Sequence, residues 1–468
     1  MTPDPALPIS PDVLQRFDVP GPRYTSYPTA DRFVEAFGPA QLEQALAQRA
    51  GGVGTLGGRR AALSLYVHIP FCESVCYYCA CNKIITRHHE RAAEYLDALE
   101  REIGLYVDAL GREQPVSQLH LGGGTPTFLS DEELARLMQS LRSAFRLVPG
   151  GEYSIEVDPR TVSPERLSRL VSLGFNRISL GVQDFDPEVQ KAVHRVQAFD
   201  SVAGLIERAR ELGIESVNAD LIYGLPRQTA ASFARTLELI GQLRPDRIAL
   251  YGYAHLPARF KPQRRIQAAE LPGAADKLAM LSAAIASFAR AGYDYIGMDH
   301  FALHTDALAV AKRQGRLHRN FQGYSTQPDS DLIALGVSAI GRLGSHYSQN
   351  AKTLPEYYDA LRQGQFPVAR GLALTRDDLV RRAVIMALMC QGHVAFESIE
   401  LSYLIDFRRY FAAELAQLEP MAEQGLLRIE ADGLHVSPAG WYVVRGIAMV
   451  FDKYLQAERS RERFSRII

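Results

Sequence analysis

The sequence alternates short apolar segments with amphipathic helical patterns six times in succession, and this alternation restricts the fold more than any other feature. Each apolar segment is rich in β-branched and aromatic residues, and a stretch with helical periodicity follows it. A β-then-α series of this length predicts a parallel sheet with right-handed crossovers that curls toward a barrel. The strands are predicted at residues 63–69, 118–122, 152–158, 177–182, 217–223 and 247–253, and the helices near 91–110, 131–146, 163–173, 199–212, 229–242 and 275–291.

The segments on either side of this series have different patterns. Residues 1–60 contain scattered prolines and then a Gly-rich stretch, which predicts an N-terminal arm and a linker. The predicted domains are this arm, a barrel over 61–292, a connecting segment packed on the barrel over 293–365, and a C-terminal helical domain over 366–468. We therefore predict an α/β fold: a partial (β/α)6 TIM-like barrel with an N-terminal extension and a mainly helical C-terminal domain.

The C-terminal domain carries a recognisable order of elements. Helical stretches precede the segment LLRIEADGLHVSPAG, which predicts a hairpin that turns at Asp432 and Gly433. Helices followed by such a hairpin resemble a winged-helix module. A last helix is predicted from about Trp441 to Glu458.

The overall charge argues against two classes of partner. The 468 residues carry a formal net charge of -1, which gives no general attraction to nucleic acid or to an anionic membrane. The N-terminus lacks a basic region followed by an apolar run, and no stretch is apolar enough to span a bilayer. We expect a cytoplasmic protein with neither nucleic acid nor membrane as a partner.

Four of the five cysteines follow the first predicted strand, at Cys72, Cys76, Cys79 and Cys81. Disulfides across loops this short would be strained, whereas clustered thiolates bind zinc or iron–sulfur clusters. Structural zinc usually needs a second pair of ligands, and none with suitable spacing occurs. The pattern favours an iron–sulfur site, with a zinc knuckle as the alternative, and the spacing alone does not say which cysteines are ligands.

Polar or Gly-rich residues end the next four strands, where barrel enzymes place their chemistry. Three glycines, Gly122 to Gly124, follow the second strand. Glu156 and Asp158 end the third strand, Gln183 ends the fourth, and Asp220 lies in the fifth. Carboxylates accept hydrogen bonds from ribose hydroxyls or an ammonium group, and Arg195 can pair with a cofactor carboxylate. Structural salt bridges are an equally good interpretation of these charged residues at this point.

The order Cys-x3-Cys-x2-Cys directly after a barrel strand resembles the signature of the radical S-adenosylmethionine superfamily, and GGGTP at 122–126 resembles its glycine-rich motif. The resemblance implies that Cys72, Cys76 and Cys79 hold a 4Fe–4S cluster and that Cys81 is not a ligand. In the superfamily the fourth iron binds S-adenosylmethionine, and electron transfer releases a 5′-deoxyadenosyl radical.

Five motifs resemble one family within that superfamily, the oxygen-independent coproporphyrinogen III oxidases: PRYTSYPTA, YVHIPFC, CACNK, GGGTPT and a terminal RFSRII. The resemblance implies a coproporphyrinogen dehydrogenase that decarboxylates two propionates of coproporphyrinogen III to vinyl groups, giving protoporphyrinogen IX for haem synthesis. It also implies a monomer and an external electron donor such as a flavodoxin or ferredoxin. The alternatives are a radical haem chaperone, another tetrapyrrole-modifying enzyme of the superfamily, and a non-catalytic zinc scaffold. Haem chaperones typically lack the first motif and the fourth cysteine, so the oxidase is favoured.

The family resemblance further implies two S-adenosylmethionine molecules and assigns Glu156 to the catalytic residues together with the three cysteines. For substrate, Arg23 is the candidate partner of a propionate, with Tyr24 beside it, although this arm could equally serve only to hold the N-terminus on the barrel. The implied cofactor contacts are Tyr66, Tyr78, Gly123, Gly124, Thr125, Glu156, Gln183, Arg195, Asp220, Ala254, Phe321, Gln322 and Ile340.

Overall fold

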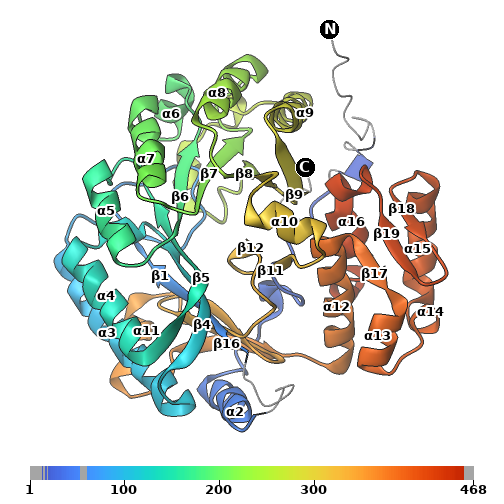
Figure 1. The fold of residues 1–468 in the computed structure, drawn as a ribbon, viewed down its shortest axis with the longest axis horizontal. Helices are drawn as coiled ribbons and strands as arrows, with labels where there is room; N and C mark the ends of the chain where they lie inside the picture. Colours follow the sequence, from blue (N-terminus) through green and yellow to red (C-terminus); the bar gives the residue numbers. More distant parts are fainter. Residues whose placement is uncertain (1–12, 14–15, 18, 53–60, 458–468) are drawn as a thin grey trace.

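A single twelve-stranded sheet organises the chain in a computed structural model, which describes residues 13, 16–17, 19–52 and 61–457. The strand order is β16-β15-β14-β13-β1-β4-β5-β6-β7-β8-β10-β9. The strands from β13 to β8 are parallel, and antiparallel strands extend the sheet at both ends. The sheet curves without closing, and helices α3, α4, α5 and α7 cover its outer face (Figure 1). The predicted partial barrel is confirmed.

The six predicted β-then-α units are all present. Their strands are β1 (Leu63–Ile69), β4 (Gln114–Gly123), β5 (Phe145–Val157), β6 (Arg177–Gln183), β7 (Ser216–Tyr223) and β8 (Arg247–Gly252). Their helices are α3 (Glu90–Leu110), α4 (Asp131–Ala144), α5 (Pro164–Ser172), α7 (Phe199–Glu211), α8 (Ala230–Leu243) and α9 (Ala274–Arg290). Short elements between them are β2 (Phe71–Cys72), β3 (Ile84–Ile85), α6 (Pro187–Ala192) and the 3-10 turns η2 (Pro126–Phe128), η3 (Lys261–Arg265) and η4 (Ala268–Glu270).

Local chemistry explains why these elements begin and end where they do. Nearly every residue of β1 is buried, as expected for a parallel strand that is covered on both faces. Helix α4 begins at Ser130, whose hydroxyl accepts a hydrogen bond from the Glu133 amide, and the Glu133 carboxylate accepts one from the Ser130 amide. On α3 the apolar stripe, which includes Leu96, Leu99 and Ile103, packs into the main core of the barrel.

The segment that we expected to connect the domains and to pack on the barrel extends the sheet. Strands β9 and β10 form one edge of the sheet, and β13 joins the parallel strands by pairing with β1, with Leu65 opposite Ile333. The boundaries at 60, 292 and 365 stay predictions. The elements of this segment are β9 (Tyr293–Gly297), β10 (His300–Leu303), α10 (Ala307–Arg313), β11 (His318–Asn320), β12 (Gly323–Ser325), β13 (Leu332–Leu335), β14 (Ile340–Leu343), β15 (His346–Asn350) and α11 (Leu354–Arg362), and β16 (Val368–Ala373) follows.

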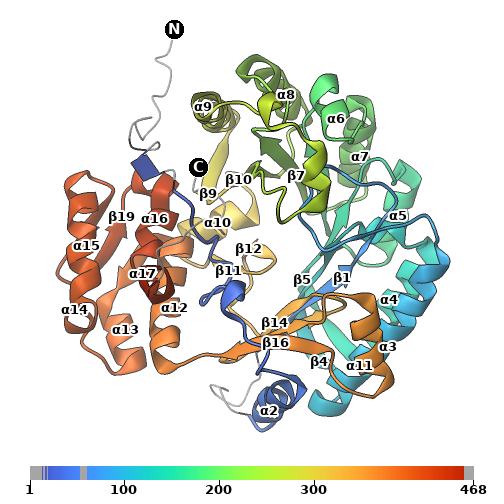
Figure 2. The ribbon, with the colours of Figure 1, turned by 180° about the vertical axis from the view of Figure 1, so that it is seen from behind.

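The N-terminal arm runs along the seam between the barrel and the C-terminal helices toward α2 (Figure 2). Its described elements are η1 (Ala30–Arg32) and α2 (Pro39–Ala50). Tyr24 and Tyr27 are fully buried in the core of the C-terminal part, where the Tyr24 hydroxyl donates to Asp452 at 3.0 Å. Most of the predicted linker, and the terminal RFSRII motif, lie outside the described residues.

The C-terminal part contains the predicted helices and hairpin. Its elements are α12 (Arg376–Gln391), β17 (His393–Ala395), α13 (Phe396–Tyr403), α14 (Phe407–Tyr410), α15 (Ala412–Glu423), β18 (Leu427–Ile429), β19 (Gly433–Val436), η5 (Gly440–Val443), α16 (Val444–Met449) and α17 (Lys453–Ala457). The hairpin β18–β19 pairs with β17 in a small sheet, so this prediction is confirmed. The single helix predicted from Trp441 to Glu458 is wrong, because Asp452 interrupts it and accepts hydrogen bonds from the amides of Tyr454 and Leu455. Among the described residues, no helix combines the length and the apolar character that crossing a membrane requires.

Candidate active site

A cavity of about 270 Å³ lies at the carboxyl ends of the central parallel strands, next to the segment that follows β1. Side chains or backbone of most predicted site residues line it, although these residues are spread over 149 positions of sequence between Cys72 and Asp220. The predicted residues that line this cavity are Cys72, Cys76, Tyr78, Cys79, Gly123, Gly124, Thr125, Glu156, Gln183, Arg195 and Asp220.

The cysteine loop is closed at its base by two short strands. Strand β2 pairs in parallel with β3, and the Thr86 amide donates to the Cys72 carbonyl at 2.9 Å. Further along, the Tyr77 amide donates to the carbonyl of Val193, which ends α6, at 3.0 Å. The loop is therefore closed by its own two ends and attached to the residue that follows α6.

Cations and a hydroxyl surround the thiols. The Cys76 sulfur accepts hydrogen bonds from Arg195 Nη1 at 3.5 Å and from Arg160 Nη2 at 3.7 Å, and Cys72 Sγ is hydrogen-bonded to Thr125 Oγ1 at 3.4 Å. Burial raises the pKa of Cys72 to about 11, whereas a hydrogen bond with Cys81, followed by the nearby charge of Lys83, lowers the pKa of Cys79 to about 6. Positive charge next to thiols favours the thiolate, which is the form that ligates metal.

The glycine turn lies directly against the cysteine loop. The Gly124 amide donates to the Ile69 carbonyl at 2.8 Å, and the Thr125 amide donates to the Phe71 carbonyl at 2.8 Å. A Cβ atom on Gly124 would come within 2.7 Å of the carbonyl oxygens of Pro70 and Phe71, which are backbone atoms. Glycine is thus required here by a close approach of two backbone segments, as the motif predicted.

The two carboxylates of the rim are held by neutral or weakly basic groups. Glu156 accepts hydrogen bonds from the Gly123 amide at 3.1 Å and is paired with His120 Nε2 at 3.3 Å. Burial opposes ionisation of Glu156, but the hydrogen bond and charge of His120 outweigh it and lower the pKa. Burial, and then the charge of Glu156, raise the pKa of Asp220 to about 6. Neither forms an ion pair with an arginine or lysine of the described chain, so the structure does not support the salt-bridge interpretation for them.

Arg195, by contrast, belongs to an ion-pair network. It is 7% exposed, pairs with Asp158 at 3.2 Å and donates to the Gly181 carbonyl at 2.7 Å. Arg160 binds the other side of Asp158 at 2.6 Å. Both arginines reach Cys76, so Asp158 sets the position of positive charge beside that thiol.

Sequence reasoning missed several residues of this cavity: Lys83, Arg160, Ser179, Gly181 and Tyr251. Asp158, which ends the third predicted strand, was expected at this edge of the sheet and does line the cavity. Arg160 and Tyr251 carried no such signal in the sequence, since one lies in an ordinary turn and the other in an apolar strand.

Five predicted cofactor contacts lie outside this cavity. The Tyr66 hydroxyl is hydrogen-bonded to His68 at 3.0 Å, and its ring stacks on His120. The Ala254 carbonyl accepts from Gln263, which also donates to the Tyr78 carbonyl and so links Ala254 to the cysteine loop. Their assignments stay predictions, as do those of the remaining three.

Those three come from the segment after β10. Gln322 donates to the Leu65 carbonyl at 3.0 Å, and Ile340 lies in β14 opposite Gln349. Phe321 lines a second cavity of about 460 Å³, together with Arg23 and other residues of the N-terminal arm.

The two candidate substrate contacts have structural partners. Arg23 forms an ion pair with Asp299, and its guanidinium carbon lies 5.3 Å from the centre of the Tyr251 ring. Tyr24 is buried and bonded to Asp452, as described above. Both residues thus help to hold the arm, and their contact with substrate stays a prediction.

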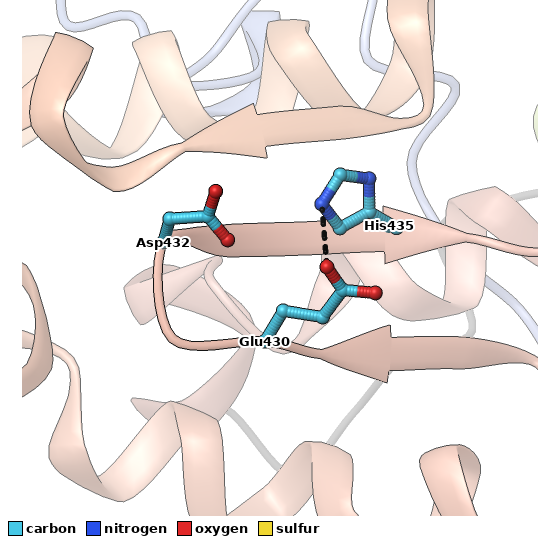
Figure 3. Close-up of side chains that lie close together, drawn as sticks. All are labelled: Glu430, Asp432 and His435. Atoms are coloured by element: carbon cyan, nitrogen blue, oxygen red, sulfur yellow. Dashed lines mark ion pairs between the residues drawn. The ribbon is translucent and has the colours of Figure 1, made fainter.

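A separate group of possible ligands lies on the C-terminal hairpin. Ligand atoms of Glu430, Asp432 and His435 lie within 4.8 Å of one another, with an ion pair of 3.6 Å between Glu430 and His435 (Figure 3). Both carboxylates are exposed, and Arg428 also pairs with Glu430 at 3.0 Å. The only indication of a metal ion is that these three ligand atoms lie close together, so we assign no metal to this group.

The cavity residues fit an iron–sulfur cluster and a nucleoside cofactor. Cysteine thiols line one cavity together with the glycine turn. Two carboxylates that no arginine or lysine of the described chain pairs with, Glu156 and Asp220, line the same cavity. Cys81 also lines the cavity, so the choice of three ligands among four cysteines stays a prediction.

Comparison with known proteins agrees with this arrangement. Residues 66–240 match the model of the Radical SAM superfamily, and residues 374–443 match that of the HemN C-terminal domain. Fold and site together define a radical S-adenosylmethionine enzyme, with a 4Fe–4S cluster and S-adenosylmethionine as cofactors.

The similarity extends to whole proteins. The oxygen-independent coproporphyrinogen III oxidase of Pseudomonas aeruginosa is 51% identical over 461 residues, which cover 98% of both chains. That of Escherichia coli K12 is 47% identical over 97% of this chain and 98% of its own. The solved structure of coproporphyrinogen III oxidase (HemN) from Escherichia coli, described as a Radical SAM enzyme, superimposes with a TM-score of 0.90 at 46% identity, covering 96% of this chain and 99% of that one. The chain belongs to the oxygen-independent coproporphyrinogen III oxidase family, which confirms the prediction.

Proposed function

We propose that this chain catalyses the anaerobic oxidative decarboxylation of two propionate side chains of coproporphyrinogen III to vinyl groups, which gives protoporphyrinogen IX for haem synthesis. The observation that carries the proposal is the 51% identity to an enzyme of that name over 98% of both chains. The geometry supports it, because thiols, glycine turn and rim carboxylates open onto one cavity.

In this proposal Cys72, Cys76 and Cys79 hold the cluster, and Cys81 does not. When bound, the cluster and S-adenosylmethionine supply a 5′-deoxyadenosyl radical that removes a hydrogen atom from a propionate. The chain's own task is to position these groups and to exclude water. The Gly123 and Gly124 backbone lines the cavity, where its carbonyls would accept from a cofactor ammonium group. Glu156 and Asp220 would accept from ammonium or ribose hydroxyls.

The remaining contacts belong to the same proposal. We assign two molecules of S-adenosylmethionine to the chain, with Tyr66, Ala254, Phe321, Gln322 and Ile340 among their contacts. Loss of carbon dioxide after hydrogen removal leaves one electron on the substrate, and an external acceptor takes it. We further propose a monomeric, cytoplasmic enzyme whose cluster is reduced by a flavodoxin or a ferredoxin.

An anaerobic assay tests the reaction. Reconstituted protein, coproporphyrinogen III, S-adenosylmethionine and a chemical reductant should give protoporphyrinogen IX, detected as protoporphyrin after oxidation. A protein with a full complement of iron and sulfide that forms no product would refute the proposed reaction.

Single Cys→Ser variants test the ligand assignment separately. Cys72→Ser, Cys76→Ser and Cys79→Ser should each lose cleavage of S-adenosylmethionine, because the cluster loses a thiolate ligand. Cys81→Ser is the matched control and should retain the cluster. Loss of the cluster from the control alone would show that Cys81 is the ligand in place of one of the three.

A further inference from the structure

Arg319 is a buried arginine that no carboxylate pairs with among the residues that the structure describes. It lies in β11 and is 6% exposed. Within the part of the chain that the structure describes, no hydrogen bond reaches its buried Nε and Nη1 atoms, and no carboxylate pairs with it. Its guanidinium carbon lies 4.5 Å from the centre of the Tyr324 ring. A guanidinium buried without an anion is strongly unfavourable, so its retention points to an anion that joins it in the working enzyme.

Comparable arginines elsewhere in the fold are paired. Arg195 pairs with Asp158 at 3.2 Å, and Arg247 pairs with Asp306 at 3.0 Å. Unlike these two arginines, Arg319 has no carboxylate partner among the described residues.

Packed rings connect Arg319 to the catalytic cavity. The Tyr324 ring beneath it packs edge-on against His300 at 5.4 Å, and His300 packs edge-on against Tyr251 at 6.1 Å. Tyr251 lines the catalytic cavity, and Phe321, two residues beyond Arg319, lines the second cavity beside Arg23. Arg319 itself lines neither cavity, but the rings packed beyond it lead to the first cavity, and Phe321 of its own segment lines the second.

The local charge balance is positive. Asp299, the carboxylate whose charge acts on His300, already forms an ion pair with Arg23. Burial, followed by the charge of Arg319, lowers the pKa of His300 to about 3, so its ring is neutral at pH 7. Its Nδ1 atom is also buried without a partner in the described chain. A bound anion would balance the positive charge around Arg319.

We propose that Arg319 binds a carboxylate of the substrate, with Arg23 beside it, and so positions the macrocycle at the Tyr251 side of the catalytic cavity. The inference rests on the proposed function, in which the substrate carries four propionates. Arginine suits this task because its planar guanidinium donates two parallel hydrogen bonds to a carboxylate. S-adenosylmethionine also carries a carboxylate, and the test separates the two sources.

The test compares Arg319→Met with the matched control Arg316→Met, which alters an exposed arginine three residues away. The ligand is coproporphyrin III, the stable oxidised tetracarboxylate, titrated anaerobically into the full-length protein by porphyrin fluorescence. Its tetramethyl ester, which lacks the charges, is titrated in parallel. Binding of S-adenosylmethionine to the reconstituted holoenzyme is measured by equilibrium dialysis, and the melting temperature is recorded for each variant.

We expect Arg319→Met to weaken coproporphyrin III binding about 10- to 100-fold, the usual effect of losing a hydrogen-bonded charge pair. Ester binding and S-adenosylmethionine binding should stay at the wild-type level, as should every property of Arg316→Met. The melting temperature should not fall, because the substitution removes a buried charge that has no partner in the free protein.

Three results would contradict the inference. Unchanged coproporphyrin III binding overturns it, and so does a lowered melting temperature with equal losses for the acid and the ester, which indicates a structural role. If Arg319→Met weakens the binding of S-adenosylmethionine but not that of coproporphyrin III, the carboxylate that Arg319 binds belongs to the cofactor. A wild-type protein that fails to convert coproporphyrinogen III contradicts the proposed function, whereas an active wild type with an unaltered Arg319→Met variant contradicts only this inference.

Discussion

Gly124 offers the sharpest test of how the glycine turn supports the cluster site. In Gly124→Ala, the new Cβ atom would lie 2.7 Å from the carbonyl oxygens of Pro70 and Phe71. Those oxygens belong to the segment that leads directly into Cys72, so no flexible side chain can absorb the contact. Restoring ordinary contact at 3.4 Å requires a backbone shift of about 0.7 Å.

The shift has two consequences. Overpacking a tight site costs about 1–3 kcal/mol of unfolding free energy. It also separates the turn from the cysteine loop, where the Gly124 amide donates to Ile69 at 2.8 Å and Cys72 bonds Thr125 at 3.4 Å. We therefore expect a lower melting temperature, a reduced iron and sulfide content after anaerobic reconstitution, and weaker binding of S-adenosylmethionine.

Gly104→Ala is the matched control. Gly104 lies within α3, and a Cβ atom there would meet nothing within 4 Å. Alanine in a helix interior is favoured over glycine by about 0.5–1 kcal/mol, so this variant should be slightly more stable and should load its cluster normally. If Gly124→Ala matched Gly104→Ala in iron content and cofactor binding, the argument that this turn must be glycine would be refuted.

Two further predictions concern Asp158 and Asp220, which both line the catalytic cavity. Asp158→Asn leaves Arg160 and Arg195 beside Cys76 without their shared anion. We expect the free energy of unfolding to fall by about 3–5 kcal/mol, which a lower melting temperature would show. The control Asp200→Asn changes an exposed aspartate and should melt like the wild type. Asp220 has a pKa raised to about 6, so it becomes charged as the pH rises through that value, and binding of the cationic cofactor should strengthen over the same range. Asp220→Asn should flatten this pH profile in equilibrium dialysis, and a profile that kept its rise would show that another group titrates.

Much of the catalytic framework could be predicted because its signals are local. Strand β1 was placed correctly because apolar residues dominate its seven positions, as expected for a strand buried on both faces. The cluster loop was equally clear, since four cysteines fall within ten residues, from Cys72 to Cys81. Glu156 and Asp220 followed from the rule that parallel strands deliver their carboxyl ends to one edge.

Features that depend on distant partners could not be predicted. Strand β13 has only four residues, too few to show a periodicity, and it becomes a strand because β1 offers an unpaired edge. The interruption between α16 and α17 also depends on a partner that is distant in sequence. Asp452 lies in a helical pattern, but it binds the Tyr24 hydroxyl from 428 positions earlier in the sequence.

The charge partners within the cavity were also hidden. Arg160 lies in a turn without a motif, and only the folded chain shows that it shares Asp158 with Arg195. Tyr251 reads as a core residue of β8, although it lines the cavity. Sequence patterns reveal which edge of the sheet is functional, but not which ordinary residues fold onto it.

The pairing of β1 with β13 has a consequence for the order in which the protein is made. Strand β1 carries the cluster loop at its end, and one of its two neighbours, β4, leaves the ribosome soon after it. The other neighbour arrives much later: the hydroxyls of Ser64 and Ser330, which bond at 2.9 Å, are separated by 266 positions. Pairing over such separations forms late during folding. We expect the chain to acquire its iron only when translation is well past residue 335, as a nearly complete protein.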